Sequence, residues 1–217
     1  MDINVKVKNE ENSKTNDDKI NDENTKKIDK DIVSELEIKI IGFFDKDLII
    51  TEAKKYELTM KKGLNFDDIA SVFSATKKLH KDDNKDIVVN GFSVKNDKMV
   101  AKYLQQNCLI LSKNTFLDTN LSVYDNIKIV SIMYSGYNLA DACLSSFNIK
   151  ELADKKVSEL TNEERKIVIL SYTVCCPAII WLIDDVLFKN LSNDKLEIIE
   201  NAIKIRLKHG GAVLKVM

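Results

Sequence analysis

The 217-residue chain is long enough for one ordinary domain or two small ones, and its 44% hydrophobic content is enough for a sizeable core. Its charged residues make up 31% but nearly cancel to a net charge of −1, which excludes a general attraction to nucleic acid or to an anionic membrane. No apolar segment typical of a secretory signal begins the chain, and no stretch reaches the roughly 18 apolar residues that span a bilayer. We therefore expect a protein that is soluble, or held to a membrane only by a partner.

The first part of the chain, from Met1 to about Asp31, consists almost entirely of Lys, Asp, Glu, Asn and Thr. Such a segment cannot bury enough apolar surface to offset the entropy of ordering it, so we expect a disordered tail over 1–31. Acidic and basic residues alternate in it, which does not favour a nucleic-acid-binding arm. One folded domain is expected over 32–217.

The first half of this domain contains mostly short strand patterns. Leu36–Ile40 alternates apolar and polar residues as a half-buried strand does. Apolar residues within 68–79 recur at helical spacing. Further strands are expected at 47–51, 56–60, 86–91 and 107–111, the third of them ending in an Asn90-Gly91 turn.

The second half contains longer helical patterns. Helices are expected over 122–134, 139–147, 161–173 and 194–207. Thr161 and Glu164 have the spacing of a capping box, and Gly210-Gly211 ends the last helix before a strand begins at Ala212. The continuous apolar run Ala178–Ile183 is typical of a strand buried on both faces. Strands alternating with helices indicate the α/β class with a mainly parallel sheet.

The four cysteines, Cys108, Cys143, Cys175 and Cys176, form no CxxC pair and no Cys–His cluster with the spacing of metal ligands. We expect buried free thiols in a reducing compartment.

The strongest local signal for chemistry is the acid pair Asp184-Asp185 at the end of the buried run. The carboxyl ends of central strands are where α/β folds place their ligands. In nucleotide hydrolases the first acid holds Mg²⁺ and the second orients the attacking water. The alternative, with equal weight from this feature alone, is two solvated acids that end a strand.

Three segments together resemble an ABC ATPase, and specifically the CcmA family, the ATPase subunit of the haem exporter of c-type cytochrome maturation. Val157–Lys166, the following helix and Cys176–Val186 have the order of a signature loop, a helix and a Walker B strand. Asn120–Asn126 resembles the start of the family's helical subdomain, and Gly210–Leu214 resembles the strand that leads to its switch histidine. The resemblance covers about 33–217. It implies a P-loop NTPase-like ABC ATPase domain with a helical subdomain at about 120–172.

The resemblance places the family's phosphate-binding loop, GxxGxGK followed by Ser or Thr, on eight residues whose chemistry has changed. These positions are Gly63, Leu64, Asn65, Phe66, Asp67, Asp68, Ile69 and Ala70. Gly63 and Asn65 match the family. Phe66 and Asp68 replace glycines, Ile69 replaces the lysine, and Ala70 replaces the hydroxyl that binds Mg²⁺. Phenylalanine blocks the close approach of backbone to phosphate, the two aspartates repel it, and isoleucine cannot pair with it.

The other motifs of the family are altered as well. The signature loop reads Leu160, Thr161, Asn162, Glu163 and Glu164, and Glu163 would repel a nucleotide on an opposing subunit. Asn114 stands at the Q-loop position. By the same resemblance Asp184 is the Mg²⁺ acid, and Asp185 takes the place of the catalytic glutamate with one methylene fewer. The sequence reaches Met217 where the switch histidine is expected to follow, and neither His209 nor His80 is expected to replace it.

The resemblance also implies cofactors, partners and a location. The resemblance implies ATP and Mg²⁺ as cofactors, a dimer of like or unlike ATPase subunits, and a CcmB-type permease at the cytoplasmic face of the inner membrane. It implies no nucleic-acid partner, and it puts the permease-docking surface on 122–147.

Four functions remain open at this point. The first function is a haem-exporter ATPase, and the second is a pseudo-ATPase scaffold on the permease. The third is a decaying gene product and the fourth an ABC subunit for another cargo. The absent lysine favours the second or third.

Overall fold

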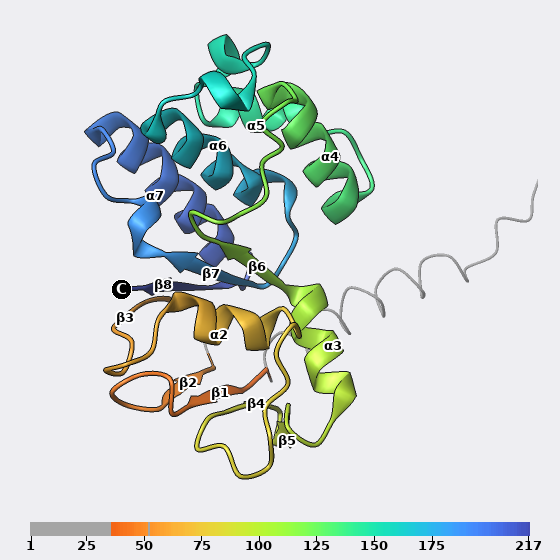
Figure 1. The fold of residues 1–217 in the computed structure, drawn as a ribbon, viewed down its shortest axis with the longest axis vertical. Helices are drawn as coiled ribbons and strands as arrows, with labels where there is room; N and C mark the ends of the chain where they lie inside the picture. The colour runs from red at the N-terminus through yellow and green to blue at the C-terminus, as the bar shows by residue number, and fades with distance from the viewer. Residues whose placement is uncertain (1–35, 52) are drawn as a thin grey trace, which may run out of the picture. The chain divides into compact units, whose positions relative to one another are not determined.

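The computed structural model describes residues 36–51 and 53–217, and the expected tail over 1–31 lies outside them. The described chain forms two four-stranded sheets with helices on both sides of one of them (Figure 1). The first sheet is antiparallel, in the order β2-β1-β4-β5. Its strands are β1 (Ile38–Ile41), β2 (Leu48–Ile50), β4 (Asp86–Val89) and β5 (Phe92–Ser93).

A two-residue turn joins β4 to β5 at the predicted position. Asn90 and Gly91 both have positive φ, 49° and 84°, which is the backbone of the hairpin turns that Asn-Gly favours. The sequence therefore predicted this hairpin correctly from its turn residues.

The second sheet is parallel throughout, with the order β3-β8-β7-β6. Its strands are β3 (Lys55–Leu58), β6 (Cys108–Leu111), β7 (Ile180–Asp184) and β8 (Ala212–Val216). This confirms the predicted α/β class with a mainly parallel core sheet.

Strand β7 is buried on both faces, as its unbroken apolar sequence predicts. Ile180 and Leu182 belong to the apolar cluster that joins the two sheets. Trp181 and Ile183 point the other way, into the cluster under the helices of the second half. Because successive side chains of a strand alternate, one strand supplies both cores.

Helix α2 (Phe66–Phe73) lies between the two sheets (Figure 1). It begins two residues before the predicted start at Asp68 and ends well before Leu79. Ala75 has a positive φ of 57°, and the hydroxyls of Ser74 and Thr76 bond to the carbonyl oxygen of Ser71, so the chain turns away there.

Helix α3 (Lys98–Asn107) was not predicted from the sequence. Only Val100 and Leu104 of this helix are buried, because it covers an edge of the core and exposes the rest. The Asp97 side chain accepts a hydrogen bond from the Met99 amide at 2.7 Å, which begins the helix.

The helices of the second half follow the predicted order. They are α4 (Val123–Ser135), α5 (Ala140–Ser146), α6 (Asn162–Cys175) and α7 (Asn193–Lys208), with short 3₁₀ turns η1 (Lys150–Leu152), η2 (Val157–Glu159) and η3 (Asp185–Leu187). Ser122 caps α4 by accepting from the Asp125 amide at 3.0 Å. The capping box at Thr161 and Glu164 is present at the start of α6, as predicted.

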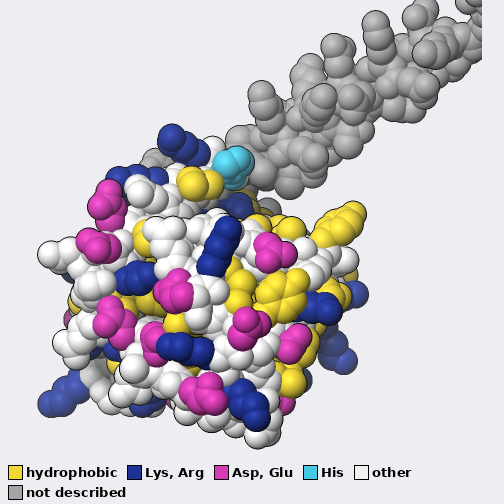
Figure 2. All heavy atoms as spheres, turned by 90° about the horizontal axis from the view of Figure 1, so that it is seen from above, with side chains coloured by type: hydrophobic (Ala, Val, Ile, Leu, Met, Phe, Trp, Pro, Cys, Tyr) yellow, Lys and Arg dark blue, Asp and Glu magenta, His cyan; other side chains and the backbone are white. Residues whose placement is uncertain are grey.

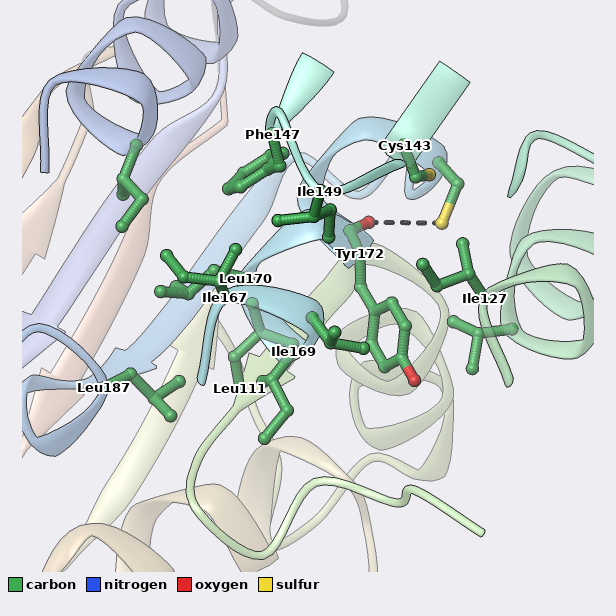
Figure 3. Close-up of a cluster of buried hydrophobic side chains, with 14 of the residues drawn as sticks. Leu111, Ile127, Cys143, Phe147, Ile149, Ile167, Ile169, Leu170, Tyr172 and Leu187 are labelled. Atoms are coloured by element: carbon green, nitrogen blue, oxygen red, sulfur yellow. Dashed lines mark hydrogen bonds between the residues drawn. The ribbon is translucent and has the colours of Figure 1, made fainter. Parts of the chain in front are cut away.

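The core beneath these helices is shown in Figure 3. Tyr172 of α6 lies in it with Ile127 of α4 and Cys143 of α5, and all three are at least 99% buried. The four cysteines are buried free thiols, which agrees with the prediction for their packing. No helix within residues 36–51 and 53–217 is long and apolar enough to cross a bilayer.

Candidate functional site

A cavity of about 490 Å³ opens at the carboxyl edge of the parallel sheet. Strands β3, β6, β7 and β8 all run towards this edge, so the segments that follow them meet there. The cavity is lined by residues from the predicted phosphate loop, the predicted Q-loop and the end of β7. These lining residues include Leu64, Asn65, Phe66, Asp67, Lys113, Asn114 and Asp184.

This arrangement brings together three segments that are far apart in the sequence. Asp184 ends β7 and faces the same cavity as Asn65 and Asn114. Asp184, at the carboxyl end of β7, therefore lies opposite the segment that begins at Gly63, as the sequence predicts.

The backbone of the Gly63 segment is a tight turn followed at once by a helix. Gly63 has φ of 87°, a conformation that glycine adopts without strain, and the Leu64 amide donates to the Lys61 carbonyl at 2.9 Å. Asn65 then caps α2, whose first residue is Phe66. There is thus only one residue, Leu64, between the turn glycine and the cap.

Two amides at the start of α2 are used inside the protein. The Asp68 amide donates to Asn65 Oδ1 at 3.2 Å, and the Asn65 amide donates to Asp68 Oδ2 at 2.9 Å. These reciprocal bonds form a capping box. The Asp68 carboxylate therefore occupies the Asn65 amide, and the Asn65 side chain occupies the Asp68 amide, both backbone donors of the kind that a phosphate loop presents to its ligand.

Phe66, at one of the family's glycine positions, and Ile69, at the lysine position, point into the core. Phe66 is 8% exposed and Ile69 is fully buried, both in the cluster between the two sheets. Asp67 is exposed and lines the cavity, whereas Ala70 is half-buried and does not line it. Of the charged side chains in this segment, only the Asp67 carboxylate is presented to the cavity.

The two acids after β7 have different surroundings. Asp184 Oδ1 accepts from the Val186 amide at 3.0 Å, and burial raises the pKa of Asp184 against this opposing hydrogen bond. Asp185 begins η3 and forms ion pairs with Lys215 Nζ at 2.9 Å and Lys189 Nζ at 3.2 Å. Burial works to raise the pKa of Asp185, but the hydrogen bonds from both lysines outweigh it and the pKa is lowered. Asp185 does not line the cavity.

The segment after β6 supplies the cavity's cation. The Ser112 amide donates to Thr115 Oγ1 at 2.8 Å and the Asn114 amide donates to Ser112 Oγ at 3.1 Å, which fixes a compact turn. Lys113 and Asn114 of this turn line the cavity. Sequence reasoning selected Asn114 and missed Lys113, although a lysine directly after a buried parallel strand is a recognisable signal for this edge.

The signature-loop positions lie elsewhere, at the start of α6. Thr161 Oγ1 accepts from the Glu164 amide at 3.2 Å, and Glu164 also pairs with Lys155 Nζ at 2.8 Å. The hydrogen bond from Lys155, with those at Thr161, lowers the pKa of Glu164 to about 2. Glu163 accepts from the Ser192 amide at 3.0 Å, Asn162 is exposed, and Leu160 is largely buried. None of these residues is among those that line the cavity within the described chain.

The two histidines are also outside this cavity. His209 follows α7, where its Nδ1 donates to the Ile205 carbonyl at 2.8 Å. His80 is exposed in a loop. Neither takes part in the carboxyl-edge arrangement.

A surface of exposed apolar side chains lies on and just beyond α4. Ile129, Ile132, Met133 and Tyr134 of the helix are 41–78% exposed, and Tyr137 after it is 72% exposed. We call these five residues the α4 surface. Figure 2 views the side of the protein that carries α4–α7 and shows apolar side chains between the charged ones there. Exposed apolar side chains gathered on one helix are typical of an interaction surface.

Curated sequences similar to this chain are ATP-binding export proteins of cytochrome c biogenesis, named CcmA. The proteins from Rickettsia bellii and Rickettsia conorii are each 30% identical to it over 107 residues, which is 49% of this chain and 54% or 56% of theirs. The protein from Rickettsia typhi is 27% identical over the same length. The chain therefore spans about half the length of the curated relatives it matches. No protein-family model matches it.

Solved structures with the same fold are ABC ATP-binding proteins. A putative ABC transporter ATP-binding protein from Pyrococcus furiosus matches with a TM-score of 0.61 and 19% identity, over 83% of this chain and 90% of that one. An ATP-binding cassette solved as a post-hydrolysis dimer with ADP and phosphate matches with a TM-score of 0.61 and 13% identity, over 84% and 87%. The chain thus has the ABC ATPase fold and resembles CcmA in sequence.

Proposed function

We propose that this CcmA-like chain is a peripheral ABC-transporter subunit whose nucleotide binding and hydrolysis are impaired. The observation that carries the proposal is the capping box at Asn65 and Asp68, directly followed by a fully buried Ile69 at the position of the phosphate-binding lysine. A triphosphate needs free backbone donors and a cation at these places.

The fit of ATP and of Mg²⁺ to the cavity differs. Asp184 and Asn114 are oxygen donors of the kind that Mg²⁺ prefers, and both line the cavity. The phosphate side does not fit, because the Asn65 and Asp68 amides are occupied and Asp67 adds negative charge. Lys113, in the turn after β6, contributes a cation to the cavity, but it does not replace the backbone amides that a phosphate loop supplies. We therefore derive no hydrolysis step for this chain.

The surroundings of Asp185 support the same conclusion. A carboxylate that orients a water for attack on phosphate needs an unoccupied acceptor oxygen directed at the reacting atoms. Here one oxygen of Asp185 pairs with Lys215 and the other with Lys189. These partners lie on β8 and just after η3, and Asp185 is not among the residues that line the cavity.

A second candidate, favoured by the α4 surface, is a non-catalytic scaffold that docks on a membrane permease. The CcmA likeness suggests a permease of the CcmB type, haem as the cargo, and a position at the cytoplasmic face of the inner membrane. The chain would then pair with a like or an unlike ATPase subunit. A decaying gene product is the remaining alternative, and it predicts no partner.

Nucleotide binding is tested by thermal unfolding of the full chain with and without about 1 mM Mg·ATP. A ligand present at about 100 times its dissociation constant stabilises by about 2.7 kcal/mol, which shifts the midpoint visibly. We expect no shift. Stabilisation with a micromolar midpoint would reject the proposal of an impaired site.

Docking is tested by capturing the chain on detergent-solubilised CcmB-type permease. The variant Met133→Asp places a charge on the α4 surface, and Phe92→Asp is the matched control, because Phe92 is 62% exposed on β5, a strand of the antiparallel sheet. Capture of wild type and Phe92→Asp with loss of Met133→Asp supports the scaffold. Equal capture of all three, or of none, contradicts docking through the α4 surface.

A further inference from the structure

A second cavity, of about 530 Å³, lies at the amino end of β7, under the carboxyl-terminal parts of α6 and α7. Its walls are mainly apolar, with Phe147, Trp181, Ile198 and Ala202 among them. Its volume is in the range of cavities that bind small organic molecules. Trp181 lies near the amino end of β7 and Asp184 lies at its carboxyl end, so this cavity is separate from the carboxyl-edge site.

The polar groups in this cavity include two buried hydrogen-bond donors. The indole Nε1 of Trp181 and the Nε of Arg206 are both buried and have no hydrogen-bond partner among the described residues. Trp181 as a whole is only 3% exposed. Buried donors are almost always paired in folded proteins, so these two atoms are exceptions, and both belong to side chains that line the cavity.

The formal charge lining the cavity is positive. It comes from Arg206, and the lining contains no Asp or Glu from the described chain. Arg206 Nη1 donates to the Pro177 carbonyl at 3.3 Å, but no ion pair joins Arg206 to a carboxylate among residues 36–51 and 53–217. Burial lowers the pKa of Arg206, which reflects the cost of holding this cation away from water.

The packing around Gly211 holds Arg206 in this place. A Cβ atom at Gly211 would lie 2.0 Å from Arg206 Nε and 2.9 Å from its Cγ and Cδ. Only glycine leaves room for the arginine stem against the backbone here. The fold therefore accommodates a half-buried arginine that has no acidic partner.

We propose that this cavity binds a small amphipathic carboxylate, with the apolar body against Phe147, Trp181 and Ala202 and the carboxylate at Arg206. An arginine can donate two parallel hydrogen bonds to a carboxylate. The apolar body covers the aromatic and aliphatic walls. Arg206 supplies the positive charge that an alkyl carboxylate needs and that a neutral apolar ligand does not.

The chain contains one tryptophan, Trp181, so its fluorescence reports directly on this cavity. The probe is sodium decanoate, titrated into the full chain below the concentration at which it forms micelles. We expect a saturable change in tryptophan emission. Acetate has the anion without the apolar body, and decanol has the body without the anion, so both are expected to bind at least tenfold more weakly.

Variants test the two halves of the cavity. Arg206→Gln removes the charge and is expected to weaken decanoate binding roughly tenfold or more, which is the value of a charge-assisted hydrogen bond. Ala202→Phe fills the apolar part and is expected to abolish binding. Lys204→Gln, an exposed position on the same helix, is the matched control and is expected to bind as wild type does.

The result that overturns the proposal is an unchanged emission with decanoate, or equal affinity in wild type and Arg206→Gln. Circular dichroism shows whether Ala202→Phe is folded. If it is not, Gly211→Ala replaces it, because displacing Arg206 is expected to weaken decanoate binding as well. Nucleotide binding plays no part in this test, so its outcome is independent of the function proposed above.

Discussion

The substitution Ile69→Lys restores the family's phosphate-binding lysine in the sequence, and we expect it to destabilise the protein without restoring nucleotide binding. Ile69 is fully buried between α2 and the two sheets. A lysine there loses about 1.5–3 kcal/mol of apolar burial. Placing an ammonium group in the core costs several kcal/mol more. The total of about 4 kcal/mol or more is a large part of the stability of an ordinary domain.

The assay is urea unfolding followed by circular dichroism at 222 nm. With a typical dependence of about 2 kcal/mol per molar urea, the midpoint of Ile69→Lys is expected to fall by about 2 M. The control is Asp67→Lys, which places the same side chain on an exposed residue of the same helical turn. Surface changes of this kind usually stay within about 0.5 kcal/mol, so its midpoint is expected to change by less than about 0.3 M.

The same two variants are then titrated with Mg·ATP. Neither is expected to bind it, since the Asn65 and Asp68 amides remain in the capping box. An Ile69→Lys protein that is as stable as wild type and binds Mg·ATP would refute the reasoning. That result would mean that residue 69 faces the cavity, and that α2 begins after it.

Three further predictions follow from the caps, ion pairs and thiols. Asn65→Ala removes the cap of α2 and is expected to lower the free energy of unfolding by about 1 kcal/mol, measured by urea unfolding. Glu164→Gln keeps the capping bond but loses the pair with Lys155. Because the folded pKa of Glu164 is about 2, below its ordinary value of 4.5, its charge stabilises above pH 4.5 and this contribution is lost as pH falls through 2. The urea midpoints of wild type and Glu164→Gln should therefore converge between pH 4.5 and 2. Burial raises the pKa of Cys108, which lines neither of the two cavities, so a disulfide exchange reagent at pH 8 is expected to react with it only as fast as the protein unfolds. Rapid labelling of Cys108 in the folded protein would contradict this.

Much of the fold was predictable because local signals agreed with tertiary packing. The unbroken apolar run of β7 indicated burial on both faces, and the capping box at Thr161 marked the start of α6. Helix α3 was missed, since only Val100 and Leu104 of it face the core and the pattern is correspondingly weak. Most of its remaining residues are polar or exposed, and such a pattern predicts a loop.

The candidate site was predicted in outline but not in its contacts. The resemblance to ABC ATPases placed Asn65, Asn114 and Asp184 in one site, and the structure brings them to one edge because parallel strands end together. The ion pair between Asp185 and Lys215 depends on the register of β7 against β8, which pairs Ile183 with Lys215 and which no local pattern encodes. The start of α2 was also hidden, since the likeness to a phosphate loop suggested irregular backbone where the capping box forms a helix.

The first turn of α2 has a consequence for how this protein can change in evolution. A phosphate loop here requires glycines in place of Phe66 and Asp68 and a lysine in place of Ile69. Each of these substitutions alone removes either buried apolar surface or a helix cap, and none supplies a ligand site by itself. Epistasis is therefore expected among these three positions, because each single substitution is predicted to destabilise the start of α2.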